Sequence, residues 1–258
     1  MDARRAAILD AIGIDRFVAR RGAAGAESAP DPGVAEASSP APARRRPIRA
    51  PAVAMPAVAT PAATTVADDV ATLDWAQLEG RVAACTRCSL AATRTQTVFG
   101  TGDRRARWLL VGEAPGADED RQGEPFVGRA GQLLNSMLRA AGFERGEVYI
   151  ANVLKCRPPA NRDPGPEEAR CCLPYLHRQI ALVNPDLVLC LGRIAAQNLL
   201  GVDTPLGQLR GRVHRLAPLG TPVVVSYHPA YLLRSPSEKR KSWADLRLAL
   251  ETARGQRA

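Results

Sequence analysis

The sequence predicts an α/β protein, built as a three-layer α/β/α sandwich around a central, largely parallel four-stranded sheet. The main observation is an alternation, from residue 73 onward, of short apolar runs with amphipathic segments, which is the order in which parallel sheets are built. A second observation is the run PDLVLCLG at 185–192, which is largely apolar and indicates a buried strand. Ligands of such sheets bind beyond the carboxyl ends of the strands.

The expected elements follow one another in a regular order. Helices are expected within 72–85, 131–143, 166–184, 193–201 and 237–255, and strands within 106–112, 147–156, 185–192 and, as a pair, 211–226. Gly142 predicts the end of the second of these helices, and Pro166 the start of the third. The loops after WLLVG, YIANV and VVVSYH all fall at the carboxyl edge of the sheet, so we expect the site there.

The chain divides into three parts. Residues 1–21 carry apolar side chains at helical spacing and are expected to form a short amphipathic helix. Residues 22–72 are rich in Ala and Pro, and they cannot bury enough surface to offset their ordering entropy, so a disordered linker is expected. Residues 73–258 form the expected folded domain.

The charge of the chain is compatible with a polyanionic partner. Its net charge is +9, and most of the excess falls on residues 73–258. Nucleic acid is one such partner, although an arginine-rich composition alone gives the same balance. No apolar run reaches the length of a transmembrane helix, and the first residues lack the features of a signal peptide. We therefore expect a protein of the cytoplasm (nucleoid), where thiols stay reduced. A monomer is expected.

Four of the six cysteines form two pairs that flank the expected core: Cys85 with Cys88, and Cys156 with Cys172. Four thiolates can hold a tetrahedral zinc ion or an iron–sulfur cluster, and the spacing alone does not separate the two. Cys171 competes with its neighbour as a ligand, and Cys190, inside an apolar strand, is most simply a buried core thiol. Four unrelated cysteines are the alternative.

Three long motifs follow the CTRC pair in order: GEAPGADEDRQGEPFVGRAGQLL, NVLKCRPPANR and SYHPAYLLR. Together they closely resemble the family 4 uracil-DNA glycosylases, iron–sulfur enzymes of the uracil-DNA glycosylase superfamily, over about residues 73–250. The resemblance implies the fold expected above and an enzyme that hydrolyses the N-glycosidic bond of uracil in DNA, leaving an abasic site, in base-excision repair. It also implies a [4Fe–4S] cluster with these ligands: Cys85, Cys88, Cys156 and Cys172.

The resemblance also implies a pocket for a uracil that is flipped out of DNA. Phe126 would stack on the base, Asn152 would read its N3–H and O4, and His228 would donate to O2 as negative charge grows there. The GEAPG backbone would lie against the base, so Glu113 and Ala114 belong to the same site. Glu113 joins the histidine as a catalytic candidate; the alternatives are that it holds its own loop through backbone bonds or limits the room near uracil C5. Without the motifs, Phe126 could be a core aromatic residue, Asn152 a strand-end cap and His228 a loop histidine.

The glycine-rich segment differs from that of the wider superfamily. Ala114 stands where the classical enzymes have a water-activating aspartate, and Gly116 where they have a tyrosine, as in family 4. A dissociative path, in which uracil leaves as an anion before water adds, would need little base catalysis. Glu119 and Asp120 are expected only to cap the segment that follows. A covalently trapped sister group has GEQPG and a basic insertion, both absent here, so we expect turnover without an adduct.

The segment after the SYHPA motif resembles the DNA-intercalation loop of the family. Leu232 or Leu233 would wedge into the base stack, with core packing of a short helix as the alternative. The basic residues of the segment would bind phosphates: Arg234, Lys239, Arg240 and Lys241. The expected partner is uracil-containing DNA, single- or double-stranded. Residues 1–21 loosely resemble a clamp-loader-binding peptide, which predicts recruitment to replication or repair proteins.

Two other functions fit parts of the sequence. A non-catalytic iron–sulfur DNA-binding protein would share the fold, but the intact set of Phe126, Asn152 and His228 argues against it. A glycosylase with a broader range of deaminated bases, such as hypoxanthine or xanthine, would share the motifs, and only competition between substrates separates it from a uracil enzyme.

Overall fold

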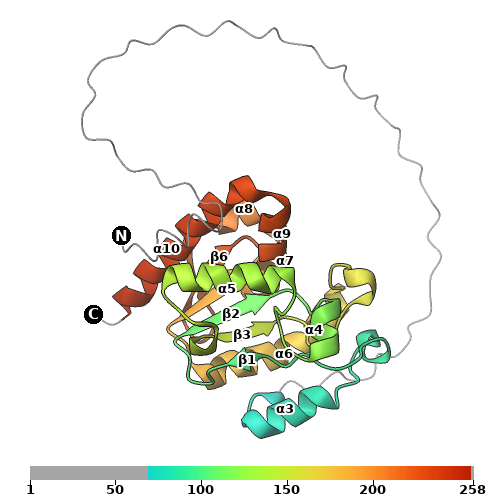
Figure 1. Ribbon diagram of the computed structural model, residues 1–258. Helices are drawn as coiled ribbons and strands as arrows, with labels where there is room; N and C mark the ends of the chain where they lie inside the picture. Colours follow the sequence, from blue (N-terminus) through green and yellow to red (C-terminus); the bar gives the residue numbers. More distant parts are fainter. Residues whose placement is uncertain (1–68, 257–258) are drawn as a thin grey trace, which may run out of the picture. The chain divides into compact units, whose positions relative to one another are not determined.

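The computed structural model describes residues 69–256, which fold around one sheet (Figure 1). The expected helix at 1–21, and all of the expected linker except 69–72, lie outside the described residues. Within the part that is described, no helix has the length and apolar character needed to cross a bilayer.

The sheet has six strands in the order β1–β3–β2–β4–β6–β5. Its four central strands run parallel: β3 (Tyr149–Asn152), β2 (Trp108–Gly112), β4 (Leu187–Leu191) and β6 (Thr221–Ser226). The edge strands pair antiparallel: β1 (Thr101–Gly102) with β3, and β5 (Val213–Leu216) with β6. The expected parallel four-stranded sheet is confirmed as the centre, and one antiparallel strand extends it at each edge.

Helices cover both faces of this sheet. Their bounds are α5 (Arg129–Ala141), α6 (Pro166–Val183), α7 (Arg193–Leu200), α9 (Pro229–Arg234) and α10 (Lys239–Gly255). Successive strand residues point to opposite faces, so Leu110 and Leu189 pack under α5, α9 and α10, while Val111 and Cys190 pack under α6 and α7. The three-layer prediction is confirmed.

Helix ends lie where the sequence places them. The α6 helix begins at Pro166, and α5 stops before Gly142, whose φ of 93° is the left-handed conformation that glycine adopts freely. The α3 helix (Trp75–Ala83) starts with a capping box at Asp74. Short elements were not expected: α4 (Ala117–Gln122), α8 (Leu206–Leu209) and the 3₁₀ turns η1 (Ser89–Ala92), η2 (Arg145–Glu147), η3 (Pro159–Asn161) and η4 (Pro236–Glu238).

Gly131, in the first turn of α5, lies directly against the backbone of the preceding loop. A Cβ atom built there would be 1.8 Å from the carbonyl oxygen of Phe126. We expect Gly131→Ala to lower the free energy of unfolding by about 3 kcal/mol or more, because backbone cannot yield as a side chain can. Urea unfolding measures this. Gly146→Ala is the control, since its Cβ meets nothing within 4 Å; equal stability of the two variants would contradict this packing.

Candidate active site

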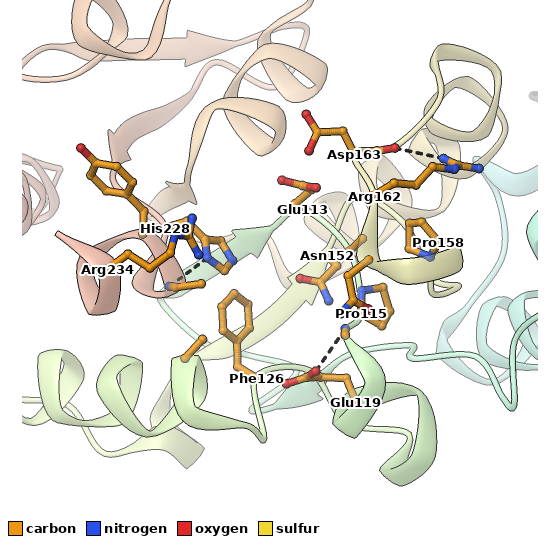
Figure 2. A pocket seen from close by; sticks show the side chains of 16 residues that line it. Glu113, Pro115, Glu119, Phe126, Asn152, Pro158, Arg162, Asp163, His228 and Arg234 are labelled. Atoms are coloured by element: carbon orange, nitrogen blue, oxygen red, sulfur yellow. Dashed lines mark hydrogen bonds between the residues drawn. The ribbon is translucent and has the colours of Figure 1, made fainter.

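A pocket of about 430 Å³ opens beyond the carboxyl ends of β2, β3 and β6 (Figure 2). Its walls come from the glycine-rich segment after β2, the loop after β3 and the start of α9. All five residues expected to contact the base line this pocket: Glu113, Ala114, Phe126, Asn152 and His228. The fold therefore brings together residues from three separate motifs.

Asn152 ends β3 with its amide facing the pocket, and the residue is only 2% exposed. Its Oδ1 has no hydrogen-bond partner among the described residues. An unpaired buried acceptor costs on the order of 1–3 kcal/mol, so a ligand that donates to it removes a penalty. The strand end is fixed by Lys155, whose buried Nζ donates to the Asn152 carbonyl (2.8 Å) and to Gln179 (2.6 Å).

Gly112 is the parallel-strand neighbour of Asn152 and leaves the space in which the amide sits. A Cβ atom at this position would be 2.3 Å from Asn152 Oδ1 and 2.6 Å from Cζ of Phe126. A side chain here would displace both groups. The first glycine of the GEAPG motif is therefore required by the packing of the site itself.

Phe126 projects into the pocket from a strained backbone. Its φ of 56° is left-handed, a conformation that costs a bulky residue on the order of 1–3 kcal/mol. Neighbouring contacts hold it: Arg145 donates to the carbonyl of Pro125 (2.6 Å), and Gly131 packs beneath the Phe126 carbonyl. The ring lies nearly parallel to that of His228, with centroids 5.5 Å apart and an interplanar angle of 29°.

Glu119 joins the two ends of the glycine-rich segment. Its carboxylate accepts from the backbone N–H of Gly116 (3.1 Å), Val127 (2.9 Å) and Gly128 (3.1 Å). It therefore fixes the backbone both before and after Phe126 in the sequence, and one of the three bonds is drawn in Figure 2. Glu119 and Asp120 are expected to cap the segment that follows them. Glu119 does so, because Val127 and Gly128 lie at the start of α5, and it also accepts from the N-cap of α4. Asp120 instead accepts from the backbone N–H of Thr95 (2.9 Å).

His228 is the N-cap of α9, and its Nδ1 accepts from the backbone N–H of Ala230 (3.1 Å). Burial and, second, the nearby Arg234 lower the pKa of this histidine to about 4, against a smaller opposing effect of Glu119. The ring is therefore neutral at pH 7. Because Nδ1 is an acceptor, the proton lies on Nε2, which makes that atom a donor.

Glu113 follows β2 and lines the pocket half-buried. Burial, and then the like charge of Asp163, raise its pKa to about 7, while Arg193 acts in the opposite direction. A carboxyl group with a pKa near neutrality is a candidate for proton chemistry.

The segment after His228 forms the short helix α9, which separates the two candidate wedge leucines. Leu232 is 1% exposed in the core shared with α5 and α10, so it cannot enter a base stack. Leu233 is 38% exposed. Of the expected phosphate ligands, Arg234 lines the pocket, whereas Lys241 is paired with Glu238 (3.0 Å). Lys239 and Arg240 lie at the start of α10, with Lys239 beside a small apolar pocket.

The four expected ligand cysteines lie in a separate hydrophobic core, which is formed by α3, part of α6 and the loops around them. Cys156 and Cys172 are buried, and the CxxC pair is partly buried. Arg94 connects the two segments, because its guanidinium donates to Cys156 Sγ (3.1 Å) and to the Cys85 carbonyl (2.8 Å). The backbone N–H of Lys155 donates to Cys172 Sγ (3.3 Å).

The other two cysteines have different surroundings. Cys171 Sγ lies 3.4 Å from the carbonyl of Arg87 and 3.7 Å from the carboxylate of Glu167. Cys190 is fully buried in β4, where burial raises its pKa to about 12, which confirms the expected core thiol. Among the described residues, no three His, Cys, Asp or Glu side chains are arranged to hold one metal ion.

Comparison with known proteins defines the class first. A family model described as the Uracil DNA glycosylase superfamily matches residues 99–247, more than half of the chain and the whole of the pocket. The chain therefore belongs to the uracil-DNA glycosylase superfamily, with which its α/β fold agrees.

Individual relatives narrow the class. The type-4 uracil-DNA glycosylase of Archaeoglobus fulgidus is 45% identical over 172 residues, which cover 64% of this chain and 86% of that protein. The type-4 enzyme of Pyrobaculum aerophilum is 41% identical over 180 residues, or 67% and 92%. A type-5 enzyme of Thermus thermophilus is 36% identical over 149 residues, or 51% and 68%. The chain belongs to the type-4 uracil-DNA glycosylases, as its motifs predict.

Proposed function

We propose that this pocket is where the enzyme removes uracil from DNA, by hydrolysis of the bond between the base and its sugar. The observation that supports the assignment is the amide of Asn152, a residue that lines the pocket with Phe126 and His228 and whose buried Oδ1 has no hydrogen-bond partner among the described residues. A base inside a duplex cannot reach such a site, so the uracil enters after rotating out of the stack.

The Asn152 amide selects the base. Its Oδ1 accepts from uracil N3–H, and its Nδ2 donates to uracil O4, while the ring of Phe126 stacks on the face of the base. Cytosine presents an acceptor and a donor at the same two positions. It would leave two buried groups mispaired, at a cost of a few kcal/mol.

The chemistry is the departure of an anion. As the bond between C1′ and N1 breaks, its electron pair passes to the base, and negative charge grows on O2. Nε2–H of the neutral His228 donates to that oxygen, an interaction that strengthens only as the bond breaks. Water then adds to C1′ of the oxocarbenium ion, and the proton that it releases neutralises the uracil anion, which gives an abasic sugar and free uracil.

Glu113 is proposed to orient the water in its ionised form. With a pKa of about 7, it gains its charge as pH rises through neutrality, so kcat/KM is expected to rise over the same interval. Glu113→Gln should flatten this limb. Asp163→Asn should move it to lower pH because the like charge is gone, and Arg193→Gln should move it to higher pH. If the inflection of the pH profile of kcat/KM stays at the same pH in both the Asp163 and the Arg193 variants, another group titrates.

Leu233 is the proposed wedge, and Arg234, at the mouth of the pocket, is the proposed phosphate ligand nearest to the flipped base. The leucine is exposed, and the arginine lines the pocket mouth two residues after the buried Leu232. Lys239, Arg240 and Lys241 are proposed to extend the phosphate contacts along the start of α10.

Cys85, Cys88, Cys156 and Cys172 are proposed to hold a [4Fe–4S] cluster. The cationic Arg94 and the N–H of Lys155 point at two of the four sulfurs, which suits thiolate ligands that carry negative charge. When bound, the cluster would fix the loop between the last two cysteines, and it has no redox step to perform in a hydrolysis. Cys171, whose sulfur faces a carbonyl and a carboxylate, is left out of the ligand set.

A single-stranded oligonucleotide with one uracil tests the proposal. We expect alkali-sensitive cleavage at the uracil over many turnovers, in EDTA, with no protein–DNA adduct on denaturing gels; an oligonucleotide with cytosine at that position is the control. Failure to cleave by protein with a full iron content would favour a non-catalytic DNA-binding protein. Faster release of hypoxanthine would indicate a broader glycosylase, and a shifted protein band a covalent mechanism.

A further inference from the structure

Tyr231 is the aromatic residue at the mouth of the pocket that the mechanism above does not use. It lies in α9, three residues after His228, and lines the pocket. It is 36% exposed, and four large apolar side chains are exposed to this extent among the described residues: Val213, Leu219, Tyr231 and Leu233. Tyr231 is the only aromatic one of the four.

One face of this ring is supported by a column of side chains. Tyr227 stacks on Tyr231 with centroids 4.9 Å apart and an interplanar angle of 27°. The guanidinium of Arg210 lies 4.0 Å from the centroid of the Tyr227 ring. Arg210 is in turn paired with Asp245 of α10 at 2.7 Å, with the two side chains 11% and 2% exposed. The column thus starts in the core and ends at the pocket mouth.

The column orders the tyrosine more than it stabilises the fold. A buried ion pair contributes little net stability because desolvation of the charges offsets their attraction. Here the ion pair fixes the guanidinium plane of Arg210, and this plane holds the ring of Tyr227 in place. The ring of Tyr227 in turn supports that of Tyr231 at the surface. An aromatic ring held in place before binding loses less conformational entropy when a partner stacks on it.

We infer that Tyr231 is a stacking platform for the nucleobase next to the flipped uracil. This inference rests on the proposed function, because a base that rotates out of DNA leaves its neighbour without a stacking partner. Arg234 lies three residues further along the same helix, which puts a positive charge beside the ring for the adjoining phosphate. Aromatic rings next to cationic side chains bind single strands in this way, with little dependence on sequence.

A double-mutant cycle tests the inference by combining substitutions of Tyr231 with removal of single bases from the DNA. Binding is measured by fluorescence anisotropy on oligonucleotides with a tetrahydrofuran abasic analogue at the uracil position, so that no turnover occurs. A second analogue then removes the base on the 5′ or the 3′ side. For the wild-type enzyme, removal on one of these sides should weaken binding by about 5-fold to 150-fold. Tyr231→Ala should weaken binding by a similar factor and abolish that dependence, while Tyr231→Phe keeps it.

Two controls separate stacking from a structural effect. Leu219→Ala, an exposed change away from the pocket, should leave binding unchanged. Arg210→Gln, which loosens the column from below, should fall between wild type and Tyr231→Ala. If the alanine variant responds to loss of the neighbouring base on either side as the wild-type enzyme does, the inference is wrong. Uracil release by the wild-type enzyme, assayed in parallel, tests the proposed function separately.

Discussion

His228→Ala is expected to lower kcat by about 10²-fold to 10³-fold, with a much smaller change in KM. That is the typical loss when one donor to a developing oxyanion is removed. The expectation follows from the geometry: Nδ1 is occupied by the N–H of Ala230, so the only proton on the neutral ring is at Nε2. Steady-state kinetics on a single-stranded uracil oligonucleotide measure the effect.

The pH dependence follows from the direction of the pKa shift. An ordinary histidine titrates near 6.5, but burial and Arg234 lower the pKa of His228 to about 4. The ring therefore stays neutral down to about pH 4, and no acid limb near pH 6.5 is expected from it. For stability the sign is the reverse of that for a salt-bridged histidine, whose pKa is raised. As pH falls from 6.5 to 4, the unfolded chain binds the proton first, so the free energy of unfolding decreases.

His177→Ala is the matched control for this prediction. That histidine is exposed, on α6, and lines a different groove. We expect its replacement to leave kcat unchanged. If both variants lose activity equally, or if His228→Ala raises KM without affecting kcat, the imidazole binds the ground state and does not stabilise the departing base.

If the proposed cluster is present, iron, sulfide and a broad visible absorbance are expected to co-purify with the wild-type protein, and Cys172→Ser is expected to abolish them. Removing a residue that only hydrogen-bonds to a metal ligand typically lowers metal affinity about 10-fold to 100-fold. Removing a ligand itself should lower the affinity for the cluster by more than this. The melting temperature should fall as well, because Cys172 packs with Cys156 and Tyr175 in the hydrophobic core beside α3.

Cys171→Ser is a close control, because it removes the adjacent thiol of the same helix. Its sulfur faces a carbonyl and a carboxylate, so iron content and absorbance should be retained. Iron analysis of the two variants, purified without oxygen, decides the ligand set. Retention of iron by Cys172→Ser and its loss from Cys171→Ser would exchange the two assignments.

Much of the fold was predictable because its signals are local and long. The parallel strands are continuous apolar runs. The end of α5 is signalled by Gly142 and the start of α6 by Pro166, and both signals act within one helical turn. The edge strand β1 has two residues and no pattern of its own. Its position depends on pairing with Tyr149 and Ile150 far along the chain, which the sequence does not display.

The site was predictable as a set of residues and less so as an arrangement. The motifs name Phe126, Asn152 and His228, but the left-handed backbone of the first and the unpaired oxygen of the second depend on tertiary packing. The two leucines after the motif are adjacent in sequence and differ only in the side of α9 that they occupy. A six-residue helix is too short for a periodic pattern to separate Leu232 from Leu233.

The carboxylate of Glu119 also ties together parts of the backbone that lie far apart in the chain. By accepting bonds from Gly116 and from Val127 and Gly128, it closes the glycine-rich segment into a loop that contains Phe126. One side chain therefore sets the shape of this wall of the pocket before any ligand arrives. A wall that is ordered in advance loses less conformational entropy when a ligand binds.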